Sequence, residues 1–325
     1  WLKPFWLKSK PRHCSQNPSL REIKAACLME MSLEASAVEW SRSLGLFKGT
    51  PADLLGEAAD VLPIVFASAL LWLSIQMLLV PVCRVVMPSF VDAVERVARE
   101  KAKGNSDVTV QEALRDVGVR FVALVFSALL SYGALRLNFD NPPQFVEDPH
   151  FSSSPYAMFY CALAAGYFLW DLPICLIYGY GPGFLIHAVF CLIVEVVALH
   201  PFNQVVMNFS HLFELSTPFL NLRLLMISSG YTHSVLFRLC EAAFGLSFFV
   251  VRILYGYFKT YEFVSRVTVD LLSGNSQIVV RKGAMFAPVA WASIVIAIVL
   301  CVLNAYWLSR ILKMAMGATR PKKTD

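Results

Sequence analysis

The sequence contains few charged residues: aspartate, glutamate, lysine and arginine together make up 16% of its 325 positions. Soluble domains carry about 25%, so the composition excludes an ordinary water-soluble domain. Hydrophobic residues reach 57%, and the mean hydropathy is +0.58. Several apolar stretches approach the ~20 residues that are needed to cross the hydrocarbon core of a bilayer. We therefore expect an integral membrane protein.

The sequence also lacks the short motifs of common soluble enzymes. It has no GxGxxG or P-loop glycine pattern, no GxSxG nucleophile motif and no HExxH zinc motif. Its eight cysteines show neither zinc-finger nor redox spacing, and most fall in or beside apolar stretches, where cysteine usually serves as a small hydrophobe. We expect no disulfide framework, no metal site and no resident cofactor.

Positive charge is not concentrated enough to indicate a nucleic-acid partner. The net charge is +5, and the basic residues are spread over loop ends and tails. Membrane lipid with anionic headgroups is the better match for these charges. The sequence does not decide between a monomer and a homodimer.

Apolar periodicity predicts an all-α polytopic membrane bundle of about seven transmembrane helices around a central cavity. The predicted spans are 61–80, 117–137, 156–178, 184–199, 202–227, 235–258 and 284–308. Residues 88–103 predict an amphipathic helix that either lies on the membrane surface or faces solvent. We divide the chain into an N-terminal segment 1–54, a transmembrane domain 55–315 and a basic tail 316–325. The chain starts with Trp1, and we expect Met29 or Met31 to be the natural start.

Basic residues predict the orientation. The connection after the first span and the C-terminal tail are both rich in lysine and arginine, whereas residues 138–155 contain neither. An odd number of spans places the two basic regions on the same side, which we expect to be cytosolic. The basic connection 259–283 fits this orientation less well. The pair Lys322-Lys323 resembles a dilysine signal for retrieval to the endoplasmic reticulum.

A polar stripe follows the predicted fifth span. Its residues step by three or four positions and therefore share one helix face: Gln204, Asn208, His211, Glu214, Pro218 and Asn221. Charged groups are costly in lipid, so the stripe should face the bundle interior. Pro218 lacks a backbone N–H and should kink the helix, leaving the carbonyl group of Glu214 free.

Other ionisable residues fall within neighbouring spans. His187, Cys191 and Glu195 share a face of the fourth span, while Asp171 and Arg252 lie in the third and sixth. Such groups either hold helices together by hydrogen bonds or line a functional cavity. The whole set favours a cavity. We interpret Glu195 and His200 as structural or interfacial residues.

The sequence also resembles a known family. The resemblance rests on an ordered series of elements: Trp170-Asp171, Ile186-His187, Phe213-Glu-Leu-Ser-Thr-Pro-Phe-Leu-Asn-Leu-Arg223, Phe249-Val-Val-Arg252, Asn304 and Trp307. Over about residues 55–315 this series is similar to the TLC-domain family, which includes ceramide synthases and translocating-chain-associated membrane proteins. The chain is most similar to members outside the ceramide synthases. The resemblance implies a helical barrel around a long lipid-accepting cavity.

Two departures from the ceramide-synthase pattern bear on activity. Those enzymes carry an adjacent pair of histidines, of which only His187 has a counterpart here, because Ile186 occupies the other position. Where the enzymes carry aspartates, this chain has Glu214 and Asn221. Both departures argue against ceramide synthesis.

The resulting hypothesis is a protein of the endoplasmic reticulum membrane that binds or senses lipid and influences lipid composition, with sphingolipid as one candidate class. The expected lipid-binding residues are His211, Glu214, Ser216, Asn221, Arg223 and Arg252. An alternative hypothesis is a ceramide-synthase-like N-acyltransferase or a related lipid acyltransferase, with acyl-CoA as co-substrate. In it His187 is the general base or a transient acyl acceptor, and Glu214 or Asp171 orients it. A translocon-associated helper is a third hypothesis.

Overall fold

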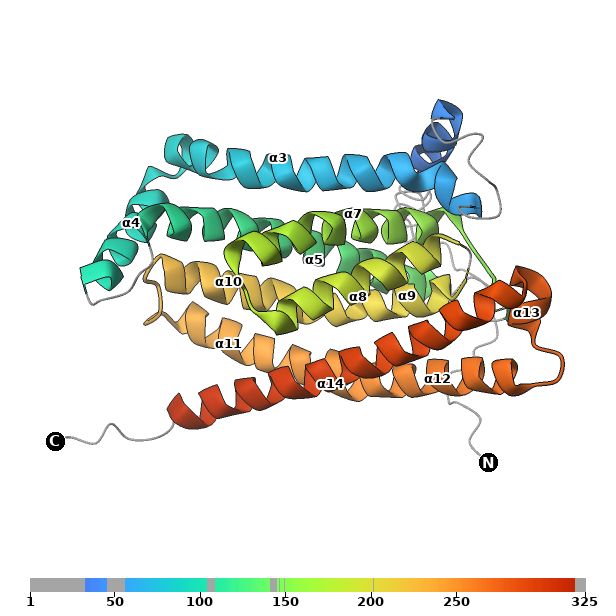
Figure 1. Ribbon diagram of the computed structural model, residues 1–325. Coiled ribbons are helices and arrows are strands. Elements are labelled where there is room, and N and C mark those ends of the chain that lie inside the picture. The colour runs from blue at the N-terminus through green and yellow to red at the C-terminus, as the bar shows by residue number, and fades with distance from the viewer. Residues whose placement is uncertain are drawn as a thin grey trace, which may run out of the picture.

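The computed structural model describes residues 33–45, 56–103, 109–140, 145, 147–148, 150–200 and 202–318. Within these ranges the protein consists of helices and loops without a strand, which confirms the predicted all-α class. The long helices lie side by side, and the chain runs along the bundle in alternating directions (Figure 1). The chain is therefore a polytopic bundle in which helices distant in sequence become neighbours.

Among the described residues, five helices are long and apolar enough to cross a membrane: Ala58–Val86, Val110–Asp140, Pro155–Tyr178, Pro182–Leu199 and Ala284–Met316. The first of these corresponds to η2 (Gly56–Val61) continued by α3 (Leu62–Val86), and the last to η5 (Ala284–Phe286) continued by α14 (Ala287–Ala318). The three between them are α5 (Val110–Asp140), α7 (Pro155–Tyr178) and α8 (Pro182–Leu199). Large apolar side chains such as Leu70, Met77 and Val302 are exposed on the outside of the bundle. An exterior of this kind suits contact with lipid tails.

The predicted fifth and sixth spans are each divided into shorter elements. The fifth consists of α9 (Gln204–Ser210), the 3-10 helix η3 (His211–Ser216) and α10 (Thr217–Ser228). The sixth consists of α11 (Val235–Phe248), the π-helix η4 (Phe249–Tyr255) and α12 (Gly256–Leu272). Neither passage contains a single α-helix of membrane-crossing length. The count of seven spans therefore stays a prediction.

The sixth passage also extends farther than expected. Residues 259–272 were expected in a polar connection, but they are helical as part of α12. Phe263 and Val267 are buried there in an apolar cluster with Ile294 of α14. Glu262 pairs with Lys259 and Arg266 elsewhere on the same helix. The segment is thus amphipathic, and packing of its apolar face stabilises the helix. The many polar residues of the segment had instead suggested a connection between helices.

Local sequence signals set several helix boundaries. Ser154 caps α7 by accepting a hydrogen bond from the backbone N–H of Ala157, and Pro155 occupies the first turn. Gly179 ends α7 in the left-handed conformation, with φ of 62°. The predicted amphipathic helix is confirmed as α4 (Pro88–Lys103).

Aromatic and small residues hold α3, α5 and α7 together. The rings of Phe126 and Tyr167 stack with their centroids 3.6 Å apart. Trp72 is 1% exposed, and its indole N–H donates to the hydroxyl of Ser68. A Cβ atom at Gly166 would lie 2.4 Å from the carbonyl oxygen of Val65. The close approach of α3 and α7 therefore requires glycine at this position.

The two regions on which the predicted orientation rests can be compared in the structure. Helix α4 and the last turns of α14 lie at the same end, and α13 (Gln277–Lys282) lies at the opposite end (Figure 1). The two basic regions therefore share a side. Which side faces the cytosol stays a prediction, and the pair Lys322-Lys323 lies outside the described residues. The six described cysteines are free, whereas Cys14 and Cys27 are not described.

Candidate functional site

The described part of the bundle contains two cavities that matter for a binding site. The aliphatic chamber has a volume of about 120 Å³, and side chains such as Val206 and Leu300 dominate its lining. The arginine chamber has a volume of about 270 Å³. It is named for the four arginines in its lining: Arg120, Arg223, Arg252 and Arg310. Both linings are largely apolar, and the arginine chamber has the larger polar share.

Four residues line both chambers and therefore lie where the chambers adjoin: Phe168, His187, Glu214 and Arg252. They come from α7, α8, η3 and η4. The sequence predicted that polar groups from separate spans converge on one interior space, and this arrangement confirms it. In particular, His187 and Glu214 line the same cavities rather than opposite outer walls of the bundle.

An ion pair between Arg252 and Glu214 is central to this boundary. The Nη2 atom of Arg252 lies 2.9 Å from the Oε1 atom of Glu214, and the two side chains are 8% and 12% exposed. Nη2 also donates to the hydroxyl of Thr217, and Nε donates to that of Ser216, each at 3.1 Å. Nη1 reaches Oδ1 of Asn304 on α14 at 3.5 Å. One guanidinium group therefore joins three helical passages.

Irregular helical turns place both partners of the ion pair. Arg252 lies in the π-helix η4, and Glu214 lies in the 3-10 helix η3. Turns of the π type are rare and often occur at functional sites. The expectation that the carbonyl group of Glu214 would be free is wrong, because it accepts a hydrogen bond from the N–H of Thr217. The tight 3-10 turn before Pro218 supplies that donor.

The polar stripe does face the interior. Gln204 and Asn208 are each 0% exposed, His211 is 3% exposed and Asn221 is 2% exposed. Two of its amides donate to backbone carbonyls four residues earlier, Asn208 to Gln204 and Asn221 to Thr217. These amides therefore act partly within their own passage. Asn221 also lines the arginine chamber.

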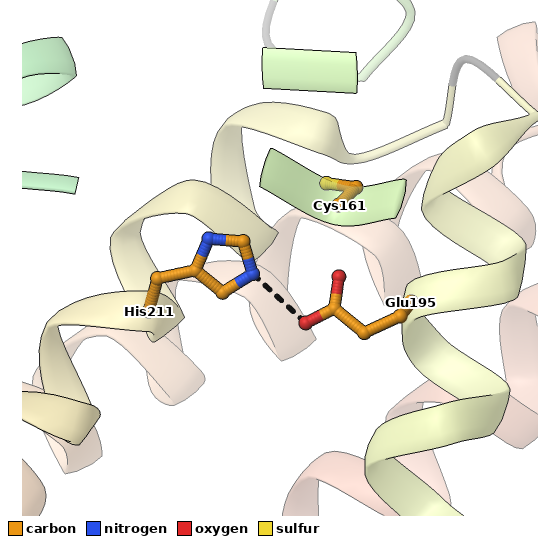
Figure 2. A group of neighbouring side chains, drawn as sticks. All are labelled: Cys161, Glu195 and His211. Carbon is orange, nitrogen blue, oxygen red and sulfur yellow. Dashed lines mark hydrogen bonds and ion pairs between the residues drawn. The ribbon is translucent and has the colours of Figure 1, made fainter. Parts of the chain in front are cut away.

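Glu195 has a deeper place than the sequence suggested. We expected a structural or interfacial role, but Glu195 is 2% exposed and its Oε1 atom lies 2.8 Å from Nε2 of His211. Figure 2 shows this pair with Cys161 beside it. The sequence did contain one indication that Glu195 faces inward, because helical spacing places it on the same face as His187. Its partner could not be foreseen, because His211 lies in a different passage.

His187 lies among aromatic rings at the chamber boundary. Its ring centroid is 5.5 Å from that of Trp307 and 5.8 Å from that of Phe168. The sulfur of Cys191 lies 3.6 Å from Nδ1 of His187. Within the described residues, no hydrogen bond joins His187 to the carboxylate of Glu214 or Asp171. The structure thus brings these three residues to one chamber without forming a histidine–carboxylate pair.

The arginine chamber contains two further charged residues from the sequence prediction. Asp171 lines it and accepts a weak hydrogen bond from the thiol of Cys175, with a sulfur–oxygen distance of 3.7 Å. Arg223 lines it too, and its Nε atom lies 2.9 Å from Oε1 of Glu241 on α11. The chamber therefore presents both acidic and basic groups.

Sequence reasoning missed Arg120. It lies in α5, where Asp116 pairs with it at 3.1 Å one helical turn earlier, and its guanidinium lies 5.0 Å from the ring centroid of Tyr180. The hydroxyl of Tyr180 donates to Asp116 at 2.8 Å. The sequence could have indicated this ion pair, because an aspartate and an arginine lie four residues apart at the start of an apolar span.

The fold and the residues inside the bundle define the class of protein. A helical bundle with an apolar exterior and buried ionisable groups facing inner cavities is a multi-pass membrane protein. The sequence profile of the TLC domain matches residues 116–313, more than half of the chain. The chain belongs to the TLC domain family. This match falls within the predicted domain 55–315, whose exact boundaries stay a prediction.

Individual relatives are similar over shorter stretches. An uncharacterized TLC domain-containing protein of Schizosaccharomyces pombe is 36% identical over 103 residues, which are 31% of this chain and 36% of the relative. An uncharacterized TLC domain-containing protein of Saccharomyces cerevisiae is 28% identical over 158 residues, or 43% and 47%. "Topoisomerase I damage affected protein 4" of the same yeast is 28% identical over 177 residues, or 52% and 60%. The chain thus spans less than two thirds of each relative.

Proposed function

We propose that this protein binds a membrane lipid within its two chambers and thereby influences membrane lipid composition. The observation that carries the proposal is that a largely apolar chamber adjoins a chamber lined by four arginines, at the buried pair of Arg252 and Glu214. A lipid has the same division into an apolar tail and a polar head. Ligand sites are typically apolar cavities with a few well-placed polar groups.

The chemistry of the linings supports one orientation of the proposed lipid. We place part of an acyl chain in the aliphatic chamber, among side chains such as Ile296 and Leu300. We place the headgroup in the arginine chamber, where Arg223 and Arg310 offer donors and Asp171 offers an acceptor. The volume of about 270 Å³ in that chamber lies slightly below the ~300–1,000 Å³ typical of ligand sites. A headgroup fits this space, and the remaining tail extends beyond it.

Binding is favoured over acyl transfer by the surroundings of His187. A general base is usually oriented by a hydrogen-bonded partner. Here Glu214 binds Arg252, and Asp171 accepts from Cys175. Lipidomics of cells that express the wild type or His187→Ala separates the two functions. We expect the same acylated lipid species in both, whereas the specific loss of one acylated product in the variant would favour an acyltransferase.

We further propose residence in the endoplasmic reticulum with a cytosolic C-terminus. The support is the shared side of the two basic regions together with the pair Lys322-Lys323. Fluorescence microscopy of Lys322→Ser/Lys323→Ser tests the retrieval signal. We expect the variant to move toward later compartments, and unchanged residence would remove this function from the pair.

Native mass spectrometry tests lipid binding itself. Protein purified in a mild detergent should retain about one lipid per chain that survives collisional activation strong enough to remove peripheral lipids. Extraction and identification of that lipid would name its class. A chain that remains folded and carries no such retained lipid would contradict the proposed function.

A further inference from the structure

A second group of side chains lies beside the aliphatic chamber. Cys161 of α7, Glu195 of α8 and His211 of η3 point toward one another (Figure 2). Each offers one atom that can bind a metal ion, and these three atoms lie within 4.8 Å of one another. Their exposed fractions are 0%, 2% and 3%. Three different donor types thus meet in an almost fully enclosed place.

The polar atoms of this group are incompletely satisfied. Glu195 uses Oε1 to bind Nε2 of His211 at 2.8 Å, but its buried Oε2 has no hydrogen-bond partner within the described part of the chain. Oδ1 of Asn208 is also buried and has no hydrogen-bond partner among the described residues. Nδ2 of the same side chain lies 4.0 Å from Sγ of Cys161. Buried polar atoms nearly always have a partner. A bound cation would satisfy the unpartnered carboxylate oxygen of Glu195 within this group of donor atoms.

We propose that Cys161, Glu195 and His211 bind one divalent transition-metal ion with the preferences of Zn²⁺. Zinc in proteins is bound by cysteine sulfur, histidine nitrogen and carboxylate oxygen, the three donor types present here. Magnesium and calcium prefer oxygen ligands, so this set disfavours them.

Charge balance supports a divalent ion. On binding, Cys161 loses its thiol proton to water. The proton between Nε2 of His211 and Oε1 of Glu195 moves to Nδ1 of His211, which has no hydrogen-bond partner among the described residues. Metal–ligand bonds from Nε2 and the carboxylate then replace the hydrogen bond between these two residues. The thiolate and the carboxylate then carry two negative charges, which one divalent ion neutralises. A neutral cluster avoids the large cost of an uncompensated charge in a nonpolar interior.

The distances require small movements. Metal–ligand bonds of about 2.0–2.3 Å place the ligand atoms of a tetrahedral site about 3.3–3.8 Å apart. The present limit of 4.8 Å therefore has to close by about 1 Å, which side-chain rotation supplies. The three helices need not shift as bodies.

The site has an entry path. Glu195 and His211 both line the aliphatic chamber, whereas Cys161 lies behind them. Three protein ligands leave a fourth position for a water molecule or a lipid oxygen at the chamber side. The metal site is independent of the proposed lipid function, because its three ligands suffice to hold an ion in a protein without lipid.

The test is metal analysis of purified full-length protein. Wild type, Cys161→Ser, Glu195→Gln and the control Cys83→Ser are purified without chelators, dialysed with Zn²⁺ and then freed of unbound metal. Cys83 is also a buried cysteine, but it lies in a separate cluster with Val91 and Leu114. We expect about one zinc per chain in wild type and Cys83→Ser, with zinc affinity at least ~10-fold weaker in the other two variants.

Loading with Co²⁺ gives a spectroscopic readout that a purely structural role would not produce. We expect a thiolate-to-cobalt charge-transfer band in wild type and Cys83→Ser, and its loss in Cys161→Ser. If Cys161→Ser does not fold, the zinc content of Glu195→Gln decides. Folded wild type with no bound zinc, or ligand variants with wild-type zinc content and affinity, would overturn the proposal.

Discussion

Arg252 and Glu214 form a buried ion pair with a distance of 2.9 Å that joins the sixth passage to the fifth. Their side chains also line both chambers. Breaking a buried pair by removal of one partner is strongly destabilising, because an uncompensated charge remains. The same contact therefore supports the bundle and fixes the polar boundary at which the proposed lipid head and tail separate.

Replacing Arg252 by lysine tests the geometry of this contact rather than its charge. Lysine keeps a positive charge but lacks the Nε atom that binds Ser216 and the planar fork that reaches Glu214, Thr217 and Asn304. We expect Arg252→Lys to lower stability by about 1–3 kcal/mol and to reduce lipid occupancy several-fold. Thermal unfolding in detergent and native mass spectrometry measure the two effects.

Arg266→Lys is the matched control for that substitution. Arg266 pairs with Glu262 on α12, but its side chain is 49% exposed. Exposed ion pairs contribute little to stability, so the melting temperature should hardly change. Equal effects at the two positions would show that the buried geometry around Arg252 has no special importance.

Glycine at position 166 should be indispensable for the contact between α3 and α7. A Cβ atom there would lie 2.4 Å from the carbonyl oxygen of Val65 and 2.5 Å from Cβ of Ser68. We expect Gly166→Ala to destabilise the protein by about 1–3 kcal/mol because backbone atoms have to move apart. Chemical or thermal unfolding of the purified protein measures this change.

Gly245 provides the comparison. It lies inside α11, and a Cβ atom added there meets nothing within 4 Å. Alanine favours a helix over glycine by up to about 1 kcal/mol, so Gly245→Ala should be neutral or stabilising. A loss of stability at Gly245 equal to that at Gly166 would contradict the packing described for α3 and α7.

Asp270 should make stability depend on pH at the end of α12. Partial burial opposes its charged form, yet hydrogen bonds from Ser276, Ile278 and Gln277 together lower the pKa of Asp270. A lowered folded-state pKa contributes stability above the unfolded value of about 3.9, and this contribution is lost as the pH falls through the folded value. We expect Asp270→Asn to be less stable than wild type at pH 7, with the difference shrinking below about pH 4. If the stability difference between wild type and Asp270→Asn stays constant down to pH 3, the charge of the Asp270 carboxylate is not its source.

The sequence was sufficient to predict the fold class, the long spans and the inward face of the fifth span. Those features depend on apolar periodicity and on the high cost of charge in lipid, which act locally along the chain. The amphipathic helix 88–103 follows from the same reasoning, since Val91, Val94 and Ala98 are buried and the basic residues lie outward. The resemblance to the TLC domain family agrees with the profile match.

The remaining features depend on contacts between distant segments. The hydrogen bond between His211 and Glu195 and the position of Cys161 beside it require α7, α8 and η3 to meet. The π turn at Arg252 and the 3-10 turn at Glu214 have no sequence pattern that separates them from an ordinary helix. For this reason cysteine spacing alone does not indicate the proposed metal site. The sequence likewise supports only a structural or interfacial role for Glu195.

Lipid occupancy of a blocked chamber tests the central claim most directly. Ala297 lines the aliphatic chamber, whereas Ala292 of the same helix is exposed on its outer surface. Native mass spectrometry compares retained lipid in wild type, Ala297→Phe and Ala292→Phe. The account predicts that Ala297→Phe loses most of the tightly retained lipid while Ala292→Phe keeps the wild-type amount. Equal retention in all three folded proteins would contradict a lipid site inside the bundle.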